Sequence, residues 1–497
     1  MRAAGFSIAA VALVFTQGVY PQGAAIPRHP RELKYQPLAY TPPKPADFRH
    51  KLSNGATAFL VEDHDFPLIN VSVLVRTGDY LDPAGKVGLA SLTGNQMRSG
   101  GTKSKPPAVF DEEVAFLAAQ LSSAMADFNG SASLNCLSKD TDAGLALLVD
   151  MLRNPGFAED RLKLAKNQIM QTMERRNDNA PDIEQREFRR LVRGDKHFST
   201  LQSTKASIES ITREDLAGFH QKYYYPANFV FAVSGDFKTK ELLAKLEKAL
   251  SGWPNGTEAV PPVPKPDYTP KPGLYVVDKK GVNQGRVRMG HLGVTIDNPD
   301  HIALNVMNGI LGGSAFTSRI TSRVRSDEGL AYQAASIFQH GTYYEGVFAA
   351  VFQSKSPSVA QAITIVNEEI AKLQNSKVTP EELATEVNSL IDSFPRRFST
   401  ASLKAGQFAN DLFNKQPDDY WLKYRDRVRA LTADEIQRVA KKYLGPDRMV
   451  ILAVGELDAM AKGNPDKPQF SLDKLSGGRG LTKIPLPDPL TMVYPAN

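Results

Sequence analysis

The sequence predicts an α+β protein made of two duplicated domains, each with an antiparallel-rich sheet that is covered by helices. Three observations support this prediction. The chain has 497 residues, which is enough for two to four domains and a sizeable core. Strand-like and helix-like segments alternate in both halves, on either side of a proline-rich segment. A stretch that begins at Ile211 is repeated, without a gap, 220 residues later.

Composition and charge are those of an ordinary globular protein. Apolar residues make up 42% of the chain and charged residues 23%. The net charge of +6 comes from mixed signs, and no basic block has interleaved aromatic residues, so nucleic acid is not an expected partner. Cys136 is the one cysteine, which excludes an intrachain disulfide.

Residues 1–25 have the pattern of a secretory signal peptide. Arg2 precedes an apolar run at residues 3–15, and small residues at 23–25 offer a cleavage site. The apolar run is too short to span a bilayer, although a short membrane anchor and a wrongly chosen start codon are the alternatives. No later segment has a transmembrane pattern. We therefore expect an exported protein without an integral membrane segment after signal removal, located in the periplasm if the source is a Gram-negative bacterium.

The N-terminal domain is expected at residues 48–250, after a proline-rich extended arm at residues 26–47. It opens with two short alternating segments around Asn54-Gly55, which is a strong signal for a β-hairpin. Further strands are expected at residues 68–76, 126–136 and 228–235. Helices are expected at residues 88–101, 109–121, 141–152, 158–177, 184–193 and 211–223.

A linker is expected at residues 251–272, because residues 251–273 contain seven prolines and no helical or strand period. The C-terminal domain then spans residues 273–460, and residues 461–497 are expected to form an irregular tail. Strands are expected at residues 273–278, 286–293, 347–353 and 448–455. Helices are expected at residues 301–311, 358–375, 380–394, 403–412 and 433–443.

The repeat places residues 211–237 over residues 431–457. The second residue of each segment is a threonine that is expected to cap a helix, followed three residues later by Asp215 or Glu435 at the capping-box position. The aligned identities include Thr212 with Thr432, Lys222 with Lys442, Tyr223 with Tyr443, Pro226 with Pro446 and Gly235 with Gly455. We interpret the repeat as an internal duplication of one α+β domain.

Residues 311–332, LGGSAFTSRITSRVRSDEGLAY, contain two candidate functional residues. Arg325 carries a permanent charge and five N–H donors in a fixed fork, and the phenol of Tyr332 can donate to an oxyanion. Gly329 predicts a helix end followed by a strand, which lets both side chains face one cleft. A structural arginine and a core tyrosine are the alternative interpretation.

The motif SR-x-x-x-x-x-R-x-x-x-GLAY resembles the C-terminal-domain signature of the insulinase/pitrilysin-type zinc metallopeptidases. The resemblance covers about residues 48 to 458 and includes duplicated halves across a proline-rich linker. It implies that Arg325 and Tyr332 reach across a cavity towards a substrate at the zinc site.

The zinc motif of that family is degenerate in this sequence. Catalytic members carry His-x-x-Glu-His after Gly-Leu-Ala, and a further glutamate on a later helix. Here Ser91, Gly94 and Asn95 follow Gly88-Leu89-Ala90, and Gln171 or Thr172 stands near the place of the later glutamate. None of these side chains can replace the zinc ligands or the catalytic glutamate.

The eight histidines offer no rearranged zinc motif, because no two of them are three or four residues apart. No cofactor is therefore expected in this chain. A zinc site assembled from scattered histidines is the alternative.

The resemblance implies a specific role, because some bacterial members work as heterodimers. This chain would be the subunit without the zinc motif, inactive alone, and would supply Arg325 and Tyr332 to a zinc-bearing homologous partner that acts on a peptide substrate. Zinc would then be bound by the partner. A non-catalytic assembly protein, like the core subunits of respiratory complexes, and a self-sufficient hydrolase are the alternatives. The sequence does not distinguish a homodimer from a heterodimer.

Overall fold

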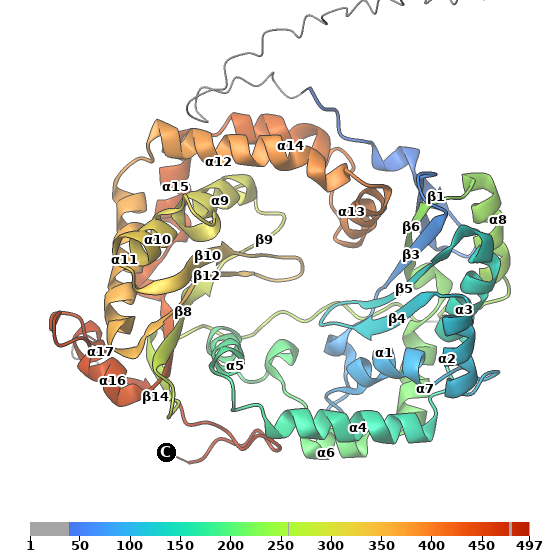
Figure 1. The fold of residues 1–497 in the computed structure, drawn as a ribbon, viewed down its shortest axis with the longest axis horizontal. Coiled ribbons are helices and arrows are strands. Elements are labelled where there is room, and N and C mark those ends of the chain that lie inside the picture. The colour runs from blue at the N-terminus through green and yellow to red at the C-terminus, as the bar shows by residue number, and fades with distance from the viewer. Residues whose placement is uncertain (1–38, 257, 477–479, 497) are drawn as a thin grey trace, which may run out of the picture. The chain divides into compact units, whose positions relative to one another are not determined.

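The computed structural model describes residues 39–256, 258–476 and 480–496 (Figure 1). Thr41–Asn497 form one compact unit. The signal peptide expected at residues 1–25, and most of the arm expected at residues 26–47, lie outside the described residues. Within the described part of the chain, no helix combines the length and apolarity needed to cross a membrane.

The N-terminal half contains a six-stranded sheet with the order β1-β2-β6-β3-β5-β4. All neighbouring pairs are antiparallel except β2 and β6, which are parallel. β1 and β2 form the predicted hairpin, and Gly55 in its turn has a φ of 92°, which glycine adopts without strain. The strands are β1 (Arg49–Lys51), β2 (Thr57–Glu62), β3 (Leu68–Val75), β4 (Gln120–Met125), β5 (Gly130–Leu137) and β6 (Phe229–Gly235).

Helices of the same half cover one face of this sheet (Figure 1). The linker at residues 251–272 contains no helix or strand in its described residues. The helices of this half, of which α5 does not belong to that layer, are α1 (Leu89–Ser99), α2 (Pro107–Phe116), α3 (Thr141–Arg153), α4 (Glu159–Glu174), α5 (Ala180–Arg193), α6 (Lys205–Ser210), α7 (Arg213–Tyr223) and α8 (Thr239–Leu250).

Strand β4 was not predicted, and its first residues were assigned wrongly to a helix at residues 109–121. α2 ends at Phe116, and Ala118 turns the chain with a φ of 47°. Leu121 is the one buried residue of β4. An edge strand with so little burial lacks the alternation of apolar residues that identifies a strand in a sequence.

The C-terminal half contains a second six-stranded sheet, with the order β10-β12-β8-β13-β7-β14, and a small sheet of β9 and β11. The strands are β7 (Gly273–Asp278), β8 (Gln284–Leu292), β9 (Val294–Thr295), β10 (Ala331–Phe338), β11 (His340–Gly341), β12 (Val347–Lys355), β13 (Val450–Gly455) and β14 (Thr482–Lys483). The helices are α9 (His301–Asn308), α10 (Arg319–Thr321), α11 (Val359–Asn375), α12 (Pro380–Ser393), α13 (Ala401–Phe413), α14 (Tyr420–Arg429), α15 (Ala433–Tyr443), α16 (Leu457–Lys462) and α17 (Leu472–Leu475).

The structure confirms the duplication. Five strands follow the same order in the two sheets: β2-β6-β3-β5-β4 in the N-terminal sheet and β7-β13-β8-β12-β10 in the C-terminal sheet. The first pair of each series, β2–β6 and β7–β13, is parallel. α7 ends at Tyr223 and α15 at Tyr443, so the two tyrosines occupy equivalent places. Both predicted capping boxes are formed, by Thr212 with Asp215 and by Thr432 with Glu435. The predicted fold class, two antiparallel-rich α+β domains, is therefore confirmed.

The two halves exchange one helix each. α5 packs against β8 and β13 of the C-terminal sheet, and α13 packs against β2 and β6 of the N-terminal sheet (Figure 1). These helices are themselves equivalent in the repeat, and Phe188 of α5 corresponds to Phe408 of α13. Phe188 lies in an apolar cluster with Val450 and Leu452 of β13. Each sheet is thus covered on its second face by a helix of the other half.

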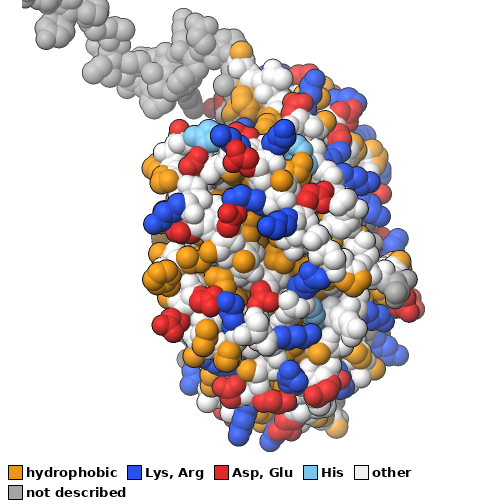
Figure 2. Space-filling model, turned by 90° about the vertical axis from the view of Figure 1, so that its right-hand side faces the viewer, with side chains coloured by type: hydrophobic (Ala, Val, Ile, Leu, Met, Phe, Trp, Pro, Cys, Tyr) orange, Lys and Arg blue, Asp and Glu red, His pale blue; other side chains and the backbone are white. Residues whose placement is uncertain are grey.

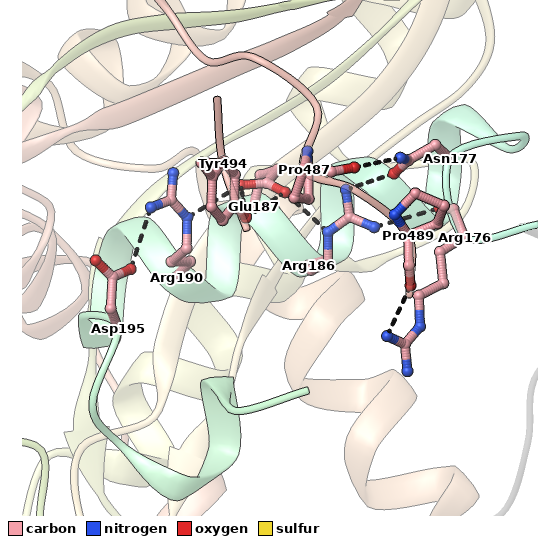
Figure 3. Close-up of polar contacts among 9 residues, drawn as sticks. All are labelled: Arg176, Asn177, Arg186, Glu187, Arg190, Asp195, Pro487, Pro489 and Tyr494. Atoms are coloured by element: carbon pink, nitrogen blue, oxygen red, sulfur yellow. Dashed lines mark hydrogen bonds and ion pairs between the residues drawn. The ribbon is translucent and has the colours of Figure 1, made fainter. Parts of the chain in front are cut away.

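The C-terminal tail also joins the two halves and contains two short elements, α17 and β14, that were not predicted. β14 adds a parallel strand beside β7. Further along, Asn177 donates from Nδ2 to the carbonyl of Pro487 at 2.8 Å (Figure 3). The hydroxyl of Tyr494 donates to the carboxylate of Glu187 at 2.9 Å, where the Glu187 side chain is 0% exposed (Figure 3).

The surface on the right-hand side of Figure 1 carries basic and acidic side chains side by side, and Figure 2 shows no block of a single sign on this face. Hydrophobic side chains are scattered between the charged groups (Figure 2). The face therefore has no extended field of one sign.

Candidate functional site

Arg325 and Tyr332 lie on consecutive elements of the C-terminal half. Arg325 belongs to a π-helical turn, Ser322–Asp327, that continues α10, and Tyr332 is the second residue of β10. Gly329 lies between them with a φ of 61°, and this left-handed conformation lets the chain leave the helix and enter the strand. The predicted helix end and following strand are confirmed. π-Helical turns occur frequently at functional sites.

The two side chains meet at the surface of the chain. The guanidinium carbon of Arg325 lies 5.3 Å from the centre of the Tyr332 ring and 5.0 Å from the centre of the Phe316 ring. Such distances allow an attraction between the cation and the ring faces. Tyr332 is 87% exposed and Phe316 is 75% exposed, so a peptide can reach both rings and the guanidinium between them.

Arg325 has no carboxylate partner among the described residues. The nearby carboxylate of Glu328 is engaged elsewhere, by Lys467 at 3.0 Å and by the side-chain amide of Gln361 at 2.9 Å. A structural arginine is normally paired with an acid, because its charge is otherwise costly to desolvate. The fork of Arg325 is held by aromatic rings alone and remains available to a ligand.

Phe316 was not predicted as a member of this cluster. It follows a second π-helical segment, Gly309–Gly313, in the turn before α10. Gly312 has a structural role in that turn, since a Cβ there would lie 2.6 Å from the backbone nitrogen of Ser336 on β10. The sequence feature that could have identified Phe316 is its position just after the pair Gly312-Gly313, in a segment without a regular spacing of apolar residues.

The degenerate zinc motif lies on α1. The hydroxyl of Ser91 donates to Asp79 at 3.2 Å. Asn95 is engaged within its own helix, where its side-chain oxygen accepts a hydrogen bond from Gln96 at 2.9 Å. Gly94 packs directly on β4, because a Cβ there would lie 2.8 Å from the backbone of Ala124 and Met125. The position that the family pattern gives to the catalytic glutamate therefore has no room for a side chain.

Thr172, near the place of the later zinc ligand, lies on α4 with its hydroxyl bonded to the carbonyl of Gln168 at 3.0 Å. Together with Ser91, Gly94 and Asn95 it gives a set of neutral hydroxyl and amide groups, whereas zinc prefers thiolate, imidazole and carboxylate. The residues present therefore do not fit a zinc ion. Across the described residues, no group of three or more His, Cys, Asp or Glu side chains is arranged to hold a metal ion.

Two half-buried acids lie beside the degenerate motif, in the wall of a cavity of about 630 Å³ that Ser91 also lines. Asp82 accepts hydrogen bonds at 2.7 Å from the backbone N–H groups of Gly88 and Ala90, and so caps the start of α1. Burial raises the pKa of Asp82 to about 7. Burial also raises the pKa of Asp79. Neither residue was predicted, and both act as supports of the α1 terminus.

Comparison with protein families identifies two matching regions. Residues 58–202 match the model described as Insulinase (Peptidase family M16). Residues 210–390 match the model described as Peptidase M16 inactive domain. The two matches cover parts of both halves of the chain.

Individual proteins show the same likeness. The Non-peptidase homolog YmxG of Helicobacter pylori is 24% identical over 388 residues, which are 77% of this chain and 88% of that protein. An Uncharacterized zinc protease of Rickettsia bellii is 21% identical over 366 residues, 72% of this chain and 86% of that protein. The crystal structure of a peptidase M16 inactive domain from Pseudomonas fluorescens is 25% identical, with a TM-score of 0.74 over 82% of this chain and 97% of that chain.

Proposed function

We propose that this chain, which belongs to the insulinase family (peptidase family M16), is the zinc-free subunit of a heterodimeric peptidase. The reason is that the chain lacks the side chains of the family's zinc motif. It acts on peptides together with a homologous subunit that carries the zinc motif. The observation that supports this proposal most strongly is the pairing of Arg325 with Tyr332. The guanidinium carbon of Arg325 lies 5.3 Å from the centre of the exposed Tyr332 ring, and Arg325 has no carboxylate partner among the described residues.

Each member of the pair has a distinct task. Tyr332 donates a hydrogen bond from its phenol to the carbonyl oxygen of the scissile peptide bond as that oxygen gains negative charge. Arg325 binds a backbone carbonyl or carboxylate of the substrate through its fork and holds the peptide in place. Such donors act by position and electrostatics, so they function equally well across a subunit interface.

The partner supplies zinc, which polarises the scissile carbonyl and activates water. This division of labour agrees with the packing of Gly94 against β4, which leaves this chain no room for the glutamate of the motif. Regaining the zinc site would require a shift of α1 as well as several substitutions.

We also propose that the two subunits work together outside the cytoplasm, in the periplasm of a Gram-negative source, on the basis of the signal pattern at residues 1–25. Amino-terminal sequencing of the protein from its native host checks this. A mature chain that begins near residue 26 supports export, and a chain that retains Met1 contradicts cleavage of the signal.

The decisive experiment combines this chain with the zinc-motif homologue from the same organism in a peptidase assay. Tyr332→Phe should lower kcat by about 10²–10³, because one oxyanion donor is lost. Arg325→Ala should mainly raise KM. Zinc content and subunit assembly should be unchanged in both variants.

Matched controls are Tyr268→Phe, on the linker, and Arg429→Ala, whose side chain forms an exposed pair with Asp426. Both should keep full activity. If Tyr332→Phe and Arg325→Ala also keep full activity, the pair is structural, and a role as a non-catalytic assembly protein becomes the better explanation.

A further inference from the structure

A second cavity, of about 550 Å³, lies where the two halves meet. α5 contributes Arg189 and Arg193 to its wall, and β8 contributes Arg288. The turn between β4 and β5 adds Asp127, and the segment before β12 adds Tyr343 and Tyr344. The volume lies within the range of about 300–1,000 Å³ that is typical of ligand pockets.

The arginines of this wall differ in how they are neutralised. Arg288 is paired through its Nε with Glu184, whose side chain is 0% exposed. Arg189 and Arg193, one helical turn apart on α5, have no carboxylate within 4.0 Å among the described residues. Asp127 is near enough to influence the pKa of Arg193 but forms no ion pair with it in the described structure.

Arg193 has unused hydrogen-bonding capacity. Its Nη1 donates weakly to the hydroxyls of Tyr344 at 3.3 Å and Ser199 at 3.4 Å. Its Nε is buried without a hydrogen-bond partner. Burial lowers the pKa of Arg193, and the neighbouring charge of Arg189 lowers it further. Two adjacent, half-buried cations without a counterion are unfavourable in the free protein and favourable to an incoming anion.

Arg189 is equally available. It makes one bond, from Nη1 to the carbonyl of Ser199 at 3.1 Å. The two guanidinium groups therefore present free donors to the same cavity, and a carboxylate is the anion whose planar geometry matches such forks. The ring of Tyr344 lies 4.9 Å from the Arg193 guanidinium and is only 3% exposed, so it packs against that group. The half-buried ring of Tyr343, in the wall of the same cavity, offers an apolar surface to a side chain of the ligand.

We propose that this cavity binds a carboxylate group of a peptide, through Arg189 and Arg193, with an apolar side chain of the same peptide against Tyr343. The inference rests on the proposed function, since it names the class of peptide that the subunit takes. The carboxylate comes from the carboxyl terminus of the peptide or from an acidic side chain within it, and the experiment distinguishes these sources.

The test measures fluorescence anisotropy with the full purified chain alone, without any partner subunit. The probe is fluorescein-labelled Gly-Ala-Ala-Phe with a free carboxyl terminus. The comparison peptides are its carboxyl-terminal amide and an amide in which Glu precedes Phe. The free acid should bind at least about tenfold more tightly than the plain amide, which corresponds to about 1.4 kcal/mol. Tight binding of the Glu-containing amide would identify an acidic side chain as the natural source.

Variants locate the site. Arg193→Gln and Arg189→Gln should each weaken binding of the free acid by about tenfold or more and abolish the preference over the amide. Arg193→Lys keeps the charge but loses the fork, and should recover only part of the affinity. Arg429→Gln is the matched control and should change nothing.

Equal binding of acid and amide by the unsubstituted chain would overturn the proposal without recourse to any variant. Loss of binding in Arg325→Ala, with Arg189→Gln and Arg193→Gln unaffected, would overturn it as well, because the carboxylate would then lie at the Arg325–Tyr332 pair. Since no catalysis is measured, failure here is separable from failure of the proposed peptidase role.

Discussion

In the N-terminal sheet the strand beside β2 is β1, joined to it by a short hairpin, whereas in the C-terminal sheet the strand beside β7 is β14. β14 comes from residues 482–483, close to the end of the chain. The same edge is therefore closed locally in one half and by a distant segment in the other. Duplication preserved the order of five strands and left the sixth position to be filled by whatever part of the chain could reach it.

The exchanged helices show a second difference. α5 and α13 are equivalent in the repeat, but Arg189 and Arg193 of α5 correspond to Ala409 and Phe413 of α13. Ala409 is 1% exposed and Phe413 is 6% exposed, so α13 fills its site with apolar side chains. α5 instead leaves a cavity lined by cations. α13 therefore packs through apolar side chains at these two positions, whereas α5 carries there the two cations of the proposed carboxylate site.

The largest effect is expected from truncating the apolar anchors of the two exchanged helices. Phe408→Ala and Phe188→Ala should each lower the free energy of unfolding by about 3–5 kcal/mol. Phe408 should be the more costly, because it is 0% exposed and its ring lies 5.7 Å from Phe48 and 5.9 Å from Phe59. Urea unfolding of the two variants measures both losses of unfolding free energy.

The two tryptophans sharpen that experiment. Trp253 belongs to the core of the N-terminal half, and Trp421 lies on α14. A chain with Trp421→Phe reports on the core of the N-terminal half through Trp253. A chain with Trp253→Phe reports on α14 and on α13, whose Asp411 accepts a hydrogen bond from Trp421. Coincident transitions are expected because each half anchors a helix of the other. Two separate transitions would show that the helix exchange does not couple the halves.

An intermediate effect is expected at the tail, which closes only the C-terminal sheet. Tyr494→Phe removes the hydrogen bond to the buried Glu187 carboxylate and should cost about 1.5–3 kcal/mol of unfolding free energy. The matched control is Tyr225→Phe, whose hydroxyl makes a long, exposed contact of 3.5 Å and should change the stability little. Equal stabilities of the two variants would mean that the tail does not secure the halves.

The smallest effect is expected at the two capping boxes, where the halves are most alike. Thr212→Ala and Thr432→Ala should each cost about 1 kcal/mol, because each removes one side-chain cap from the first turn of α7 or α15. The midpoint of urea unfolding measures the loss. A much larger cost at one threonine would indicate that the two helices no longer carry equivalent structural roles.

Local signals explain what could be predicted from the sequence. The hairpin turn at Gly55, the caps at Thr212 and Thr432, and the helix end at Gly329 each depend on a few neighbouring residues. α8 was not predicted, although Leu242, Leu246 and Leu250 lie at helical spacing along it. β4 lacked a sufficient apolar pattern, and Phe316 had no periodic context.

The sequence by itself determined the duplication, the loss of the zinc motif at Ser91, Gly94 and Asn95, and the placement of Arg325 and Tyr332 on adjoining elements. These features follow from composition, spacing and local backbone chemistry, which the order of residues specifies directly. Tertiary structure alone decided that α5 and α13 cross to opposite sheets, that β14 joins β7, and that Arg189 and Arg193 share a cavity. Those contacts join residues far apart in the chain, and no local period indicates which distant surface a helix face or an edge strand will meet.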